Sequence, residues 1–341
     1  MSERSSSAWS GRMSERPSSA WSGSMSARPM IELDNVSRLF EGVAAVDGIS
    51  LRIDSGEICV IVGTSGCGKS TTLRLLNRLI DCSSGDIRID GQAIAQLDAQ
   101  LLRRRMGYVI QNTGLFPHWT VARNISVVPR LLHWPTARIE TRVHELLELL
   151  GLPYADFAHK FPSQLSGGQA QRVGVARALA GDPEILLMDE PFGALDPITR
   201  DSLQNELLRI QSRIHKTIVF VTHDIDEALK LATRIVVMDQ GRIVQHDTPV
   251  NLLNHPANAF VESLLGQGER GLKRASLQHV AERMLPLQGT PPAFSVGAQD
   301  SLRQALSLML WHRVGELCVR DAENRAVGLL PISALLHGAT A

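Results

Sequence analysis

The hydrophobic positions follow two different rhythms along the chain. Apolar and polar residues alternate over 31–36 and 49–53, a period of two that predicts strands with one buried face. Apolar residues recur at helical spacing over 136–150 and 169–179. The whole stretch from 121 to about 179 is therefore predicted to be helical.

Short elements of both kinds fill the rest of the central region. The apolar run Ile58–Val62 predicts a strand, and residues 71–79 predict a helix. Further strands are expected around 86–94 and at 107–110, 185–188, 217–221 and 235–238, and further helices at 99–105, 198–214 and 225–231. This order predicts an α/β core over residues 30–266 with a helical subdomain inserted at about 112–182.

A second, smaller unit is predicted at the C-terminal end. The Gly- and charge-rich segment Gly266–Gly271 is expected to be a hinge, and residues 272–341 a separate small α/β module. Within the module we expect helices at 301–309 and 332–336 and strands at 316–321 and 326–331. A length of 341 residues suits two or three domains.

The first 29 residues contain an internal repeat. Met1–Arg12 and Met13–Ser24 differ only at their fifth and twelfth places, and a partial third copy begins at Met25. Ser, Arg, Gly and Pro dominate, so we expect a disordered tail over 1–29; without an apolar run it is not a secretory signal peptide. Every copy opens with Met, which favours a duplicated or misassigned start over a functional tail. The start would then lie at Met13, Met25 or Met30.

Composition narrows the class of protein. A formal net charge of zero argues against a general nucleic-acid binder. The four cysteines, Cys59, Cys67, Cys82 and Cys318, lack metal-ligand spacing and predict free thiols in a reducing compartment. No apolar run approaches the roughly 18 residues of a membrane span. We expect a soluble chain that can dock on a membrane partner.

A glycine-rich phosphate loop stands between the strand Ile58–Val62 and the next predicted helix. It fits G-x-x-x-x-G-K-[ST] at every fixed position, and the residues expected to bind nucleotide are Gly63, Thr64, Ser65, Gly66, Cys67, Gly68, Lys69, Ser70 and Thr71. The glycines let successive N–H groups point inward, and the helix adds its positive end. We expect Lys69 to bind the β- and γ-phosphates and Ser70 to bind Mg²⁺. A glycine-rich turn without a ligand is the alternative, which the agreement of pattern and context disfavours.

Cys67 lies inside this loop. A helix N-terminus lowers the pKa of a nearby thiol, so we expect Cys67 to be reactive. The alternative is a small residue that only fills space.

Two carboxylates, Asp189 and Glu190, follow the apolar run 185–188. A buried parallel strand carries its last residues to the sheet edge where the phosphate loop lies. We expect Asp189 to hold Mg²⁺ and Glu190 to polarise the water that attacks the γ-phosphate. An acidic helix cap is the alternative, which the preceding phosphate loop disfavours.

A second anion site is predicted where the helix ending at residue 179 begins. Leu165 is followed by Ser166, Gly167, Gly168 and Gln169, small residues at a helix N-terminus. The plain alternative is a serine N-cap. A chain that binds one nucleotide seldom needs two such sites.

The pentad LSGGQ, placed between a phosphate loop and the run MDEP, resembles the ATP-binding-cassette (ABC) transporter ATPases over about residues 30–266. The resemblance implies an ABC-type P-loop ATPase core that binds ATP and Mg²⁺. Gln111 is similar to the glutamine that contacts Mg²⁺ and the membrane partner, and His223 to the switch histidine at the γ-phosphate. The run Ala194-Leu195-Asp196 resembles the family's D-loop, with Asp196 as its aspartate. Phe40 stands where the family often has a tyrosine that stacks on adenine.

The resemblance also implies partners. In this family two subunits pair head to tail, so that Lys69 of one subunit faces Ser166–Gln169 of the other across ATP. A homodimer is therefore expected, together with integral-membrane permease subunits and, indirectly, a solute-binding protein. This would place the chain peripherally at the cytoplasmic face of a bacterial inner membrane, with no nucleic acid as a partner.

Two segments bear on the transported solute. Residues 109–121, VIQNTGLFPHWTV, are similar to the quaternary-amine branch, the importers of glycine betaine, carnitine or choline. The element order over 301–336 resembles a cystathionine-β-synthase (CBS) module, which these importers usually carry in tandem. This chain has one convincing copy, with a remnant at 272–292, and its tail either regulates transport or only assists pairing.

We therefore expect the ATPase subunit of a quaternary-amine importer. One alternative keeps the importer and changes the solute to an amino acid or a sulfonate. Another is a soluble ABC ATPase that acts on ribosomes or DNA.

Overall fold

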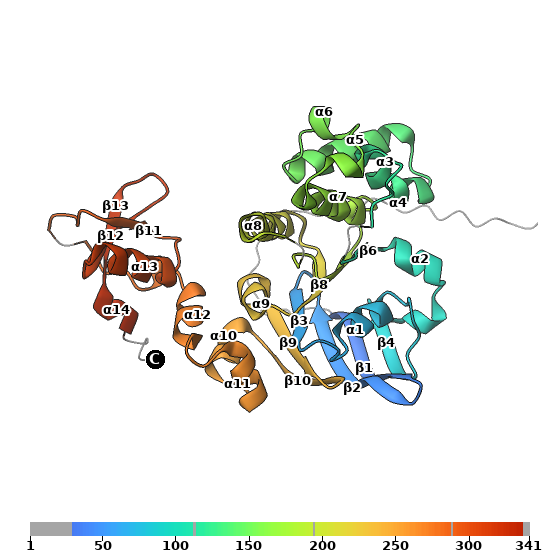
Figure 1. Cartoon of the computed structure of the whole chain (residues 1–341), viewed down its shortest axis with the longest axis horizontal. Coiled ribbons are helices and arrows are strands. Elements are labelled where there is room, and N and C mark those ends of the chain that lie inside the picture. The colour runs from blue at the N-terminus through green and yellow to red at the C-terminus, as the bar shows by residue number, and fades with distance from the viewer. Residues whose placement is uncertain (1–28, 112–113, 194, 288, 337–341) are drawn as a thin grey trace, which may run out of the picture.

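The computed structural model of the chain describes residues 29–111, 114–193, 195–287 and 289–336. The tail predicted over 1–29 lies outside these residues except for Pro29, which is the first residue of strand β1 and not part of a disordered segment. Figure 1 shows a part that contains two sheets, a helical lobe above it, and a small unit at the C-terminal end. The α/β class predicted from the sequence is confirmed.

Within the described residues, six strands form a large sheet in the order β10-β9-β3-β8-β7-β6. Their bounds are β3 (Ile58–Gly63), β6 (Met106–Val109), β7 (Ile185–Asp189), β8 (Thr217–Thr222), β9 (Arg234–Asp239) and β10 (Arg242–Asp247). All neighbours are parallel except β9 and β10, which are antiparallel. Parallel pairing brings the carboxyl ends of β3, β7 and β8 to one edge of the sheet.

A second sheet is antiparallel and packs on one face of the large sheet. Its order is β2-β1-β4-β5, with β1 (Pro29–Phe40), β2 (Val43–Asp54), β4 (Ser84–Ile89) and β5 (Gln92–Ala93). Cys59 and Ile61 of β3 share a core with this sheet and helix α1 (Lys69–Leu76), whereas Val60 and Val62 share a core with helices on the other face. The unbroken apolar run at 58–62 is thus explained by burial on both faces.

Helix α1 begins slightly earlier and ends earlier than the predicted 71–79. Arg78 has a φ of 47°, a left-handed conformation that ends a helix. The N–H of Leu79 donates to the carbonyl of Arg74, at 2.8 Å, and closes the turn. Residues 94–104, after β5, form the short 3₁₀ helix η1 (Ile94–Gln96) and helix α2 (Ala99–Arg104).

The predicted helical insertion forms the upper lobe of Figure 1. Its elements are α3 (Val121–Ile125), α4 (Val127–Leu131), α5 (Thr136–Leu149), α6 (Tyr154–Phe157), the 3₁₀ turn η2 (Pro162–Gln164) and α7 (Gly167–Leu179). Helix α7 runs back against β6, where a Cβ added to Gly107 would lie 2.6 Å from the carbonyl oxygen of Ala178. Helices α8 (Pro197–Ile214) and α9 (Ile225–Leu231) follow β7 and β8.

The C-terminal unit contains the predicted helices and strands. Helices α10 (Pro249–Asn254), α11 (Ala259–Leu265) and α12 (Arg270–Ser276) lead to η3 (Val280–Glu282), β11 (Ser295–Gly297), α13 (Leu302–His312), β12 (Glu316–Arg320), β13 (Ala326–Pro331) and α14 (Ile332–Leu336). Strand β12 pairs in parallel with β11 and antiparallel with β13. Among the helices of the described ranges, none has the length and apolar character that crossing a bilayer demands.

The segment expected to be a hinge is partly helical. Helix α12 begins at Arg270, inside Gly266–Gly271, and continues into the C-terminal unit. Ala275 packs against the core of the C-terminal unit, and Leu277, directly after α12, packs against the main core. Because α12 and the residue after it contact both cores, this helix is a bridge between them and not a free linker.

Candidate active site

The phosphate loop connects β3 to α1, as predicted, and its glycines are needed for space. A Cβ on Gly63 would lie 2.1 Å from the carbonyl oxygen of Met238, and one on Gly68 would lie 2.4 Å from that of Ala45. Gly68 also has a φ of 103°, which side chains rarely allow. The loop is therefore wedged between β9 and the start of β2.

Lys69 is only 6% exposed, and its ammonium group is held by its own loop. The Nζ atom donates hydrogen bonds of 2.8 Å to the carbonyl oxygens of Gly63 and Thr64. A buried ammonium group requires such partners. The loop thus fixes the cation that we expected to meet the phosphates.

Cys67 does not have the environment predicted for it. The side chain is 3% exposed, and burial raises the pKa of the thiol, although the Lys69 ammonium opposes this effect. Desolvation penalises the thiolate more than the neighbouring cation and helix end stabilise it. The expectation of a lowered pKa is wrong, because the sequence indicated the charge but not the burial.

Ser70 and Asp189 meet at the edge of the large sheet. The Ser70 hydroxyl donates to the Asp189 Oδ1 atom at 2.9 Å, although 119 residues separate them. Burial and the Asp189 charge raise the pKa of nearby Tyr108 to about 12. A hydroxyl and a carboxylate are oxygen ligands of the kind that Mg²⁺ prefers, and Mg²⁺ sites commonly use one or two carboxylates plus phosphate oxygens. The pair therefore fits the predicted metal role.

Glu190 is the centre of the predicted catalytic group. It has a φ of 45°, an uncommon conformation for a residue with a side chain, and its N–H donates to the Val221 carbonyl at 3.1 Å. The Gln111 Nε2 atom donates to Glu190 Oε2 at 3.0 Å, and His223 Nδ1 lies 3.5 Å from Glu190 Oε1. The structure thus brings together three predicted site residues that follow three neighbouring strands, β6, β7 and β8.

The LSGGQ helix is a separate site within this chain. Ser166 caps α7: its hydroxyl accepts from the Gln169 N–H at 3.3 Å, and the Gln169 side chain accepts from the Ser166 N–H at 3.0 Å. Helix α7 belongs to the helical lobe, whereas α1 lies in the part below it (Figure 1). The two predicted anion sites do not meet within one chain.

The two glycines of the LSGGQ motif, Gly167 and Gly168, differ in their surroundings. A Cβ on Gly168 would lie 2.3 Å from Thr199 Cγ2, whereas a Cβ on Gly167 would meet nothing within 4 Å. Gly168 is therefore required by packing against α8. Gly167 is required by nothing that the described residues place near it.

Asp196 caps α8. Its Oδ1 atom accepts from the N–H groups of Ile198 and Thr199, at 3.1 and 3.0 Å, and hydrogen bonding with Thr199 lowers the pKa of Asp196. It is thus held ionised at the start of the helix that packs on Gly168. Ala194, predicted to be part of the same D-loop, lies outside the described residues.

Phe40 ends β1 and pairs with Val43 across a tight turn. The residue is 43% exposed, and the Arg38 guanidinium lies 4.6 Å from the ring centroid. Two residues after Val43, the Ala45 carbonyl oxygen leaves no room for a side chain on Gly68 of the phosphate loop. Phe40 is therefore a partly exposed aromatic residue close to the strand segment that packs on the phosphate loop. This position suits the predicted role of stacking on adenine.

Sequence reasoning missed a set of polar contacts behind His223. The Thr222 hydroxyl donates to Glu227 Oε2 at 2.7 Å, and burial raises the pKa of Glu227. Arg200 of α8 donates to the Leu195 carbonyl at 3.1 Å and lies 3.6 Å from Asp224 and 3.8 Å from Glu227. Arg200 thus links the D-loop to the loop that carries His223. The detectable signal was the acidic first turn of the 225–231 helix.

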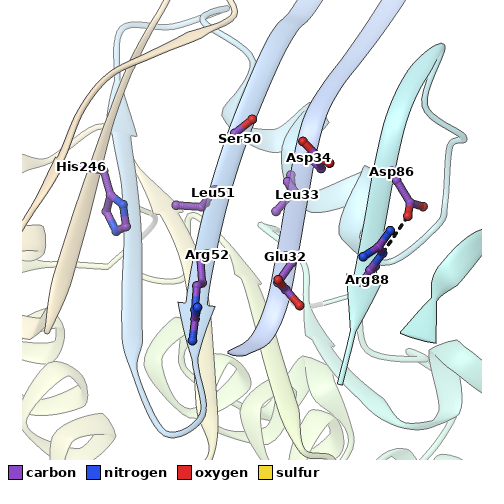
Figure 2. Close-up of a pocket in the computed structure, with 9 residues that line it drawn as sticks. All are labelled: Glu32, Leu33, Asp34, Ser50, Leu51, Arg52, Asp86, Arg88 and His246. Atoms are coloured by element: carbon purple, nitrogen blue, oxygen red, sulfur yellow. Dashed lines mark hydrogen bonds and ion pairs between the residues drawn. The ribbon is translucent and has the colours of Figure 1, made fainter. Parts of the chain in front are cut away.

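A hollow on the outer face of the antiparallel sheet β2-β1-β4-β5 is lined by none of these site residues (Figure 2). It is lined by Glu32, Leu33, Asp34, Ser50, Leu51, Arg52, Asp86, Arg88 and His246, none of which was predicted as a site residue. Arg88 pairs with Asp86 at 2.9 Å within it. Glu32 lies opposite Arg52 and Arg88 on the neighbouring strands, as is typical of a solvated sheet face, whereas Asp34 lies opposite Asp86.

Comparison with known proteins agrees with the geometry. The family model described as ABC transporter matches residues 46–193. A glycine betaine uptake system ATP-binding protein, YehX of Escherichia coli, is 48% identical over 307 residues, which cover 90% of this chain and 99% of that protein. A glycine betaine/carnitine/choline transport ATP-binding protein, OpuCA of Bacillus subtilis, is 48% identical and is matched over 89% of this chain and 78% of its own length.

Solved structures show the same fold. The ATP-binding cassette MJ0796, in a dimeric structure bound to ADP and Pi, matches with a TM-score of 0.59 and 34% identity, over 64% of this chain and 99% of that one. The structure of cbiO1 from Clostridium perfringens, part of an ABC transporter complex, matches with a TM-score of 0.63 and 28% identity, over 72% and 98% of the two chains. This chain therefore belongs to the family of ABC transporter ATP-binding proteins.

Proposed function

We propose that this chain is the ATP-hydrolysing subunit of an ABC importer that takes up a quaternary amine osmolyte such as glycine betaine, choline or carnitine. The observation that carries the solute class is the extent of the match to YehX, 307 residues at 48% identity. This is longer than the ATPase region at 30–266, so the likeness includes the C-terminal unit. A sulfate/thiosulfate import protein of Gloeobacter violaceus is 47% identical over only 237 residues.

The described contacts suggest how hydrolysis proceeds. The loop N–H groups and Lys69 bind the phosphates, and Ser70 and Asp189 would hold Mg²⁺, which supplies neutralising charge to the phosphate oxygens. Glu190 accepts a hydrogen bond from the attacking water and acts as the base. Gln111 and His223, within 3.0 and 3.5 Å of its carboxylate, orient that group.

A second copy of the chain completes the site in this proposal. Helix α7 presents an open N-terminus at Ser166 and Gly167, in a different lobe from the phosphate loop. Head-to-tail pairing would place that terminus on the γ-phosphate bound by the partner's loop. A solved relative at 34% identity is described as dimeric and bound to ADP and Pi.

Membrane-embedded permease subunits and a solute-binding protein would be the other partners, at the cytoplasmic face of a bacterial inner membrane. An aromatic cluster that follows Gln111 in the sequence supports a docking role. Phe116 is 39% exposed, and its ring centroid lies 4.4 Å from that of Trp119. The Arg123 guanidinium lies 4.5 Å from the centroid of the Trp119 ring. Aromatic residues and arginine are enriched at protein interfaces.

The order α13-β12-β13-α14 in the C-terminal unit supports our proposal of one CBS-like module, which would either regulate transport or assist pairing. Uptake measurements separate these roles. Vesicles that carry the whole transporter are loaded at several internal salt concentrations, because exposed charges are screened over about 8–10 Å at physiological salt. A salt response that changes when residues 272–341 are removed supports regulation, whereas an unchanged response with weaker pairing supports assistance.

The proposed solute class is tested in the same vesicles. MgATP-dependent accumulation of labelled glycine betaine, choline or carnitine is expected, and the Glu190→Gln variant should abolish it. Labelled sulfate is the control. Accumulation of sulfate but of none of the three amines would favour a sulfate importer, and no MgATP-dependent accumulation of any of the four would contradict the proposed solute class.

A further inference from the structure

Two lysines among the described residues are nearly buried, and only one of them belongs to the phosphate loop. Lys69 and Lys273 are each 6% exposed. Lys273 lies on α12, the helix that bridges the main core and the C-terminal unit. Burying an ammonium group costs free energy unless the group is paired with an anion. The partners of Lys273 therefore indicate which elements its buried charge connects.

The partners of Lys273 lie on two different helices. Its Nζ atom is 3.0 Å from Asp226 Oδ1 on α9 and 3.7 Å from Glu269 Oε2, one turn earlier along the chain. The two carboxylates are 62% and 69% exposed, so the amine reaches outward from a covered position between the helices. Lys273 therefore joins α12 to the first turn of α9.

Helix α12 also has other contacts with the main part of the structure. Arg270 pairs with Glu262 at 3.0 Å and donates to the Leu253 carbonyl, which anchors α12 to α10 and α11. Leu277 adds apolar contact with the main core. The Lys273–Asp226 pair is directed instead toward the helix that begins directly after His223.

The first turn of α9 is held from two sides. Asp224 caps the turn by accepting a hydrogen bond of 2.8 Å from the Asp226 N–H. On the side of the D-loop, Arg200 lies close to both Asp224 and Glu227. Asp226 faces Lys273 from the C-terminal side. Since Thr222 is bonded to Glu227, the residues on both sides of His223 are tied to this turn.

We propose that Lys273 is a positioning residue for ATP hydrolysis, which acts through Asp226 and the first turn of α9 to hold His223 against Glu190. The C-terminal unit would thereby contribute one cation to the support of the ATPase site. The inference rests on the proposed ATPase function. It differs from a purely structural role because it predicts an effect on turnover beyond any effect on folding.

The test uses the full-length chain and steady-state MgATP hydrolysis. Lys273→Met keeps the length of the side chain and removes its charge. We expect kcat to fall about three- to fivefold, the rate equivalent of one partly exposed ion pair, with KM for ATP within about twofold because the nucleotide contacts are untouched. Lys273→Arg should retain most of the turnover.

A matched control lies on the same helix. Lys230, near the end of α9, pairs with Asp201 of α8 at 2.6 Å, so Lys230→Met also removes an α9 ion pair but at the end remote from His223. Its kcat should stay within about 1.5-fold of wild type. The midpoint of thermal unfolding is measured for every variant.

A double-mutant cycle with Asp226→Asn decides whether the pair acts as a unit. The double variant should lose no more turnover than Lys273→Met alone. Equal losses for the Lys273 and Lys230 variants, additive losses in the cycle, or a lower unfolding midpoint with unchanged kcat would each overturn the inference. Asp226→Asn changes an exposed residue, so it reports even if Lys273→Met fails to fold. A wild-type chain without ATPase activity would instead contradict the proposed function.

Discussion

The phosphate loop and the LSGGQ helix are both helix starts suited to anions, but they differ in how much of a site one chain provides. Lys69 is 6% exposed and bonded to its own loop, and Ser70 already contacts Asp189. At the start of α7, by contrast, a Cβ on Gly167 would meet nothing within 4 Å. The first site is built by internal contacts, whereas the second presents an open surface.

Glycines of one motif can therefore be required for unlike reasons. Gly168 is required by this chain, because a Cβ there would lie 2.3 Å from Thr199 Cγ2. Gly167 is left free by this chain, so a requirement for glycine there has to come from what approaches it from outside. Variants of the two regions should therefore affect different steps.

The largest effect is expected at the site around the phosphate loop, called here the closed site because contacts within the chain build it. Glu190→Gln should leave ATP binding intact and lower kcat by roughly 10²–10⁴, the usual contribution of a positioned base. Because ATP would then persist, the variant should accumulate as an ATP-bound dimer, detected by size-exclusion chromatography. Glu184→Gln is the control, since Glu184 pairs with Arg105 on the surface before β7. Normal turnover of Glu190→Gln would rule out its role as base.

The second prediction contrasts the two glycines of the LSGGQ motif. Gly167→Ala should fold and bind ATP normally, yet lower hydrolysis by about 10- to 10²-fold, because a displacement of about 1 Å at the approaching phosphate has this cost. Gly168→Ala should instead lower the free energy of unfolding by about 1–3 kcal/mol through overpacking. Hydrolysis and thermal unfolding are measured for both.

Thr199→Ser provides a matched control for this pair, because it removes the Cγ2 methyl that a Gly168 side chain would strike. Combined with Gly168→Ala it should restore stability, and combined with Gly167→Ala it should change nothing. Undiminished hydrolysis by Gly167→Ala would show that its open surface receives no ligand. That result would remove the contrast between the two sites.

The third prediction concerns the aromatic residue beside the closed site. Phe40→Ala should weaken ATP and ADP binding by a similar factor, about tenfold, because an aromatic ring that stacks on a base contributes about 1–3 kcal/mol. Phe40→Tyr, which keeps the ring, should bind as wild type. Titration with a fluorescent nucleotide measures both. A loss confined to ATP would assign Phe40 to the phosphates and not to the base.

Much of this site could be predicted from the sequence, because its residues follow strands that the apolar runs reveal. Asp189, Glu190 and His223 each follow such a run, and parallel pairing alone brings them to one edge. Arg200 could not be found in this way, since its contacts depend on how α8 packs beside α9. The start of α12 inside the expected hinge could not be predicted, because Gly and charged residues there interrupt the periodic spacing of apolar residues that identifies a helix.

The burial of Cys67 was equally beyond the sequence, and it leads to the smallest predicted effect. The raised pKa keeps the thiol neutral at pH 7–8, so its alkylation should be slower than that of Cys82, which is partly exposed. The nucleophile is the thiolate, so the rate at Cys67 should keep rising as the pH passes about 8.5, the ordinary pKa of a thiol. Mass spectrometry of the labelled peptides measures both rates in one sample.

Labelling in the presence of MgATP distinguishes burial of Cys67 by the fold from coverage of Cys67 by the bound nucleotide. If the loop binds the phosphates as proposed, MgATP should slow alkylation of Cys67 further and leave Cys82 unchanged. Labelling of Cys67 should in turn inactivate hydrolysis, since the added group cannot fit beside Lys69. Rapid labelling of Cys67 at pH 7 would contradict the closed description of the loop. Full activity after complete labelling would reduce Cys67 to a residue that only fills space.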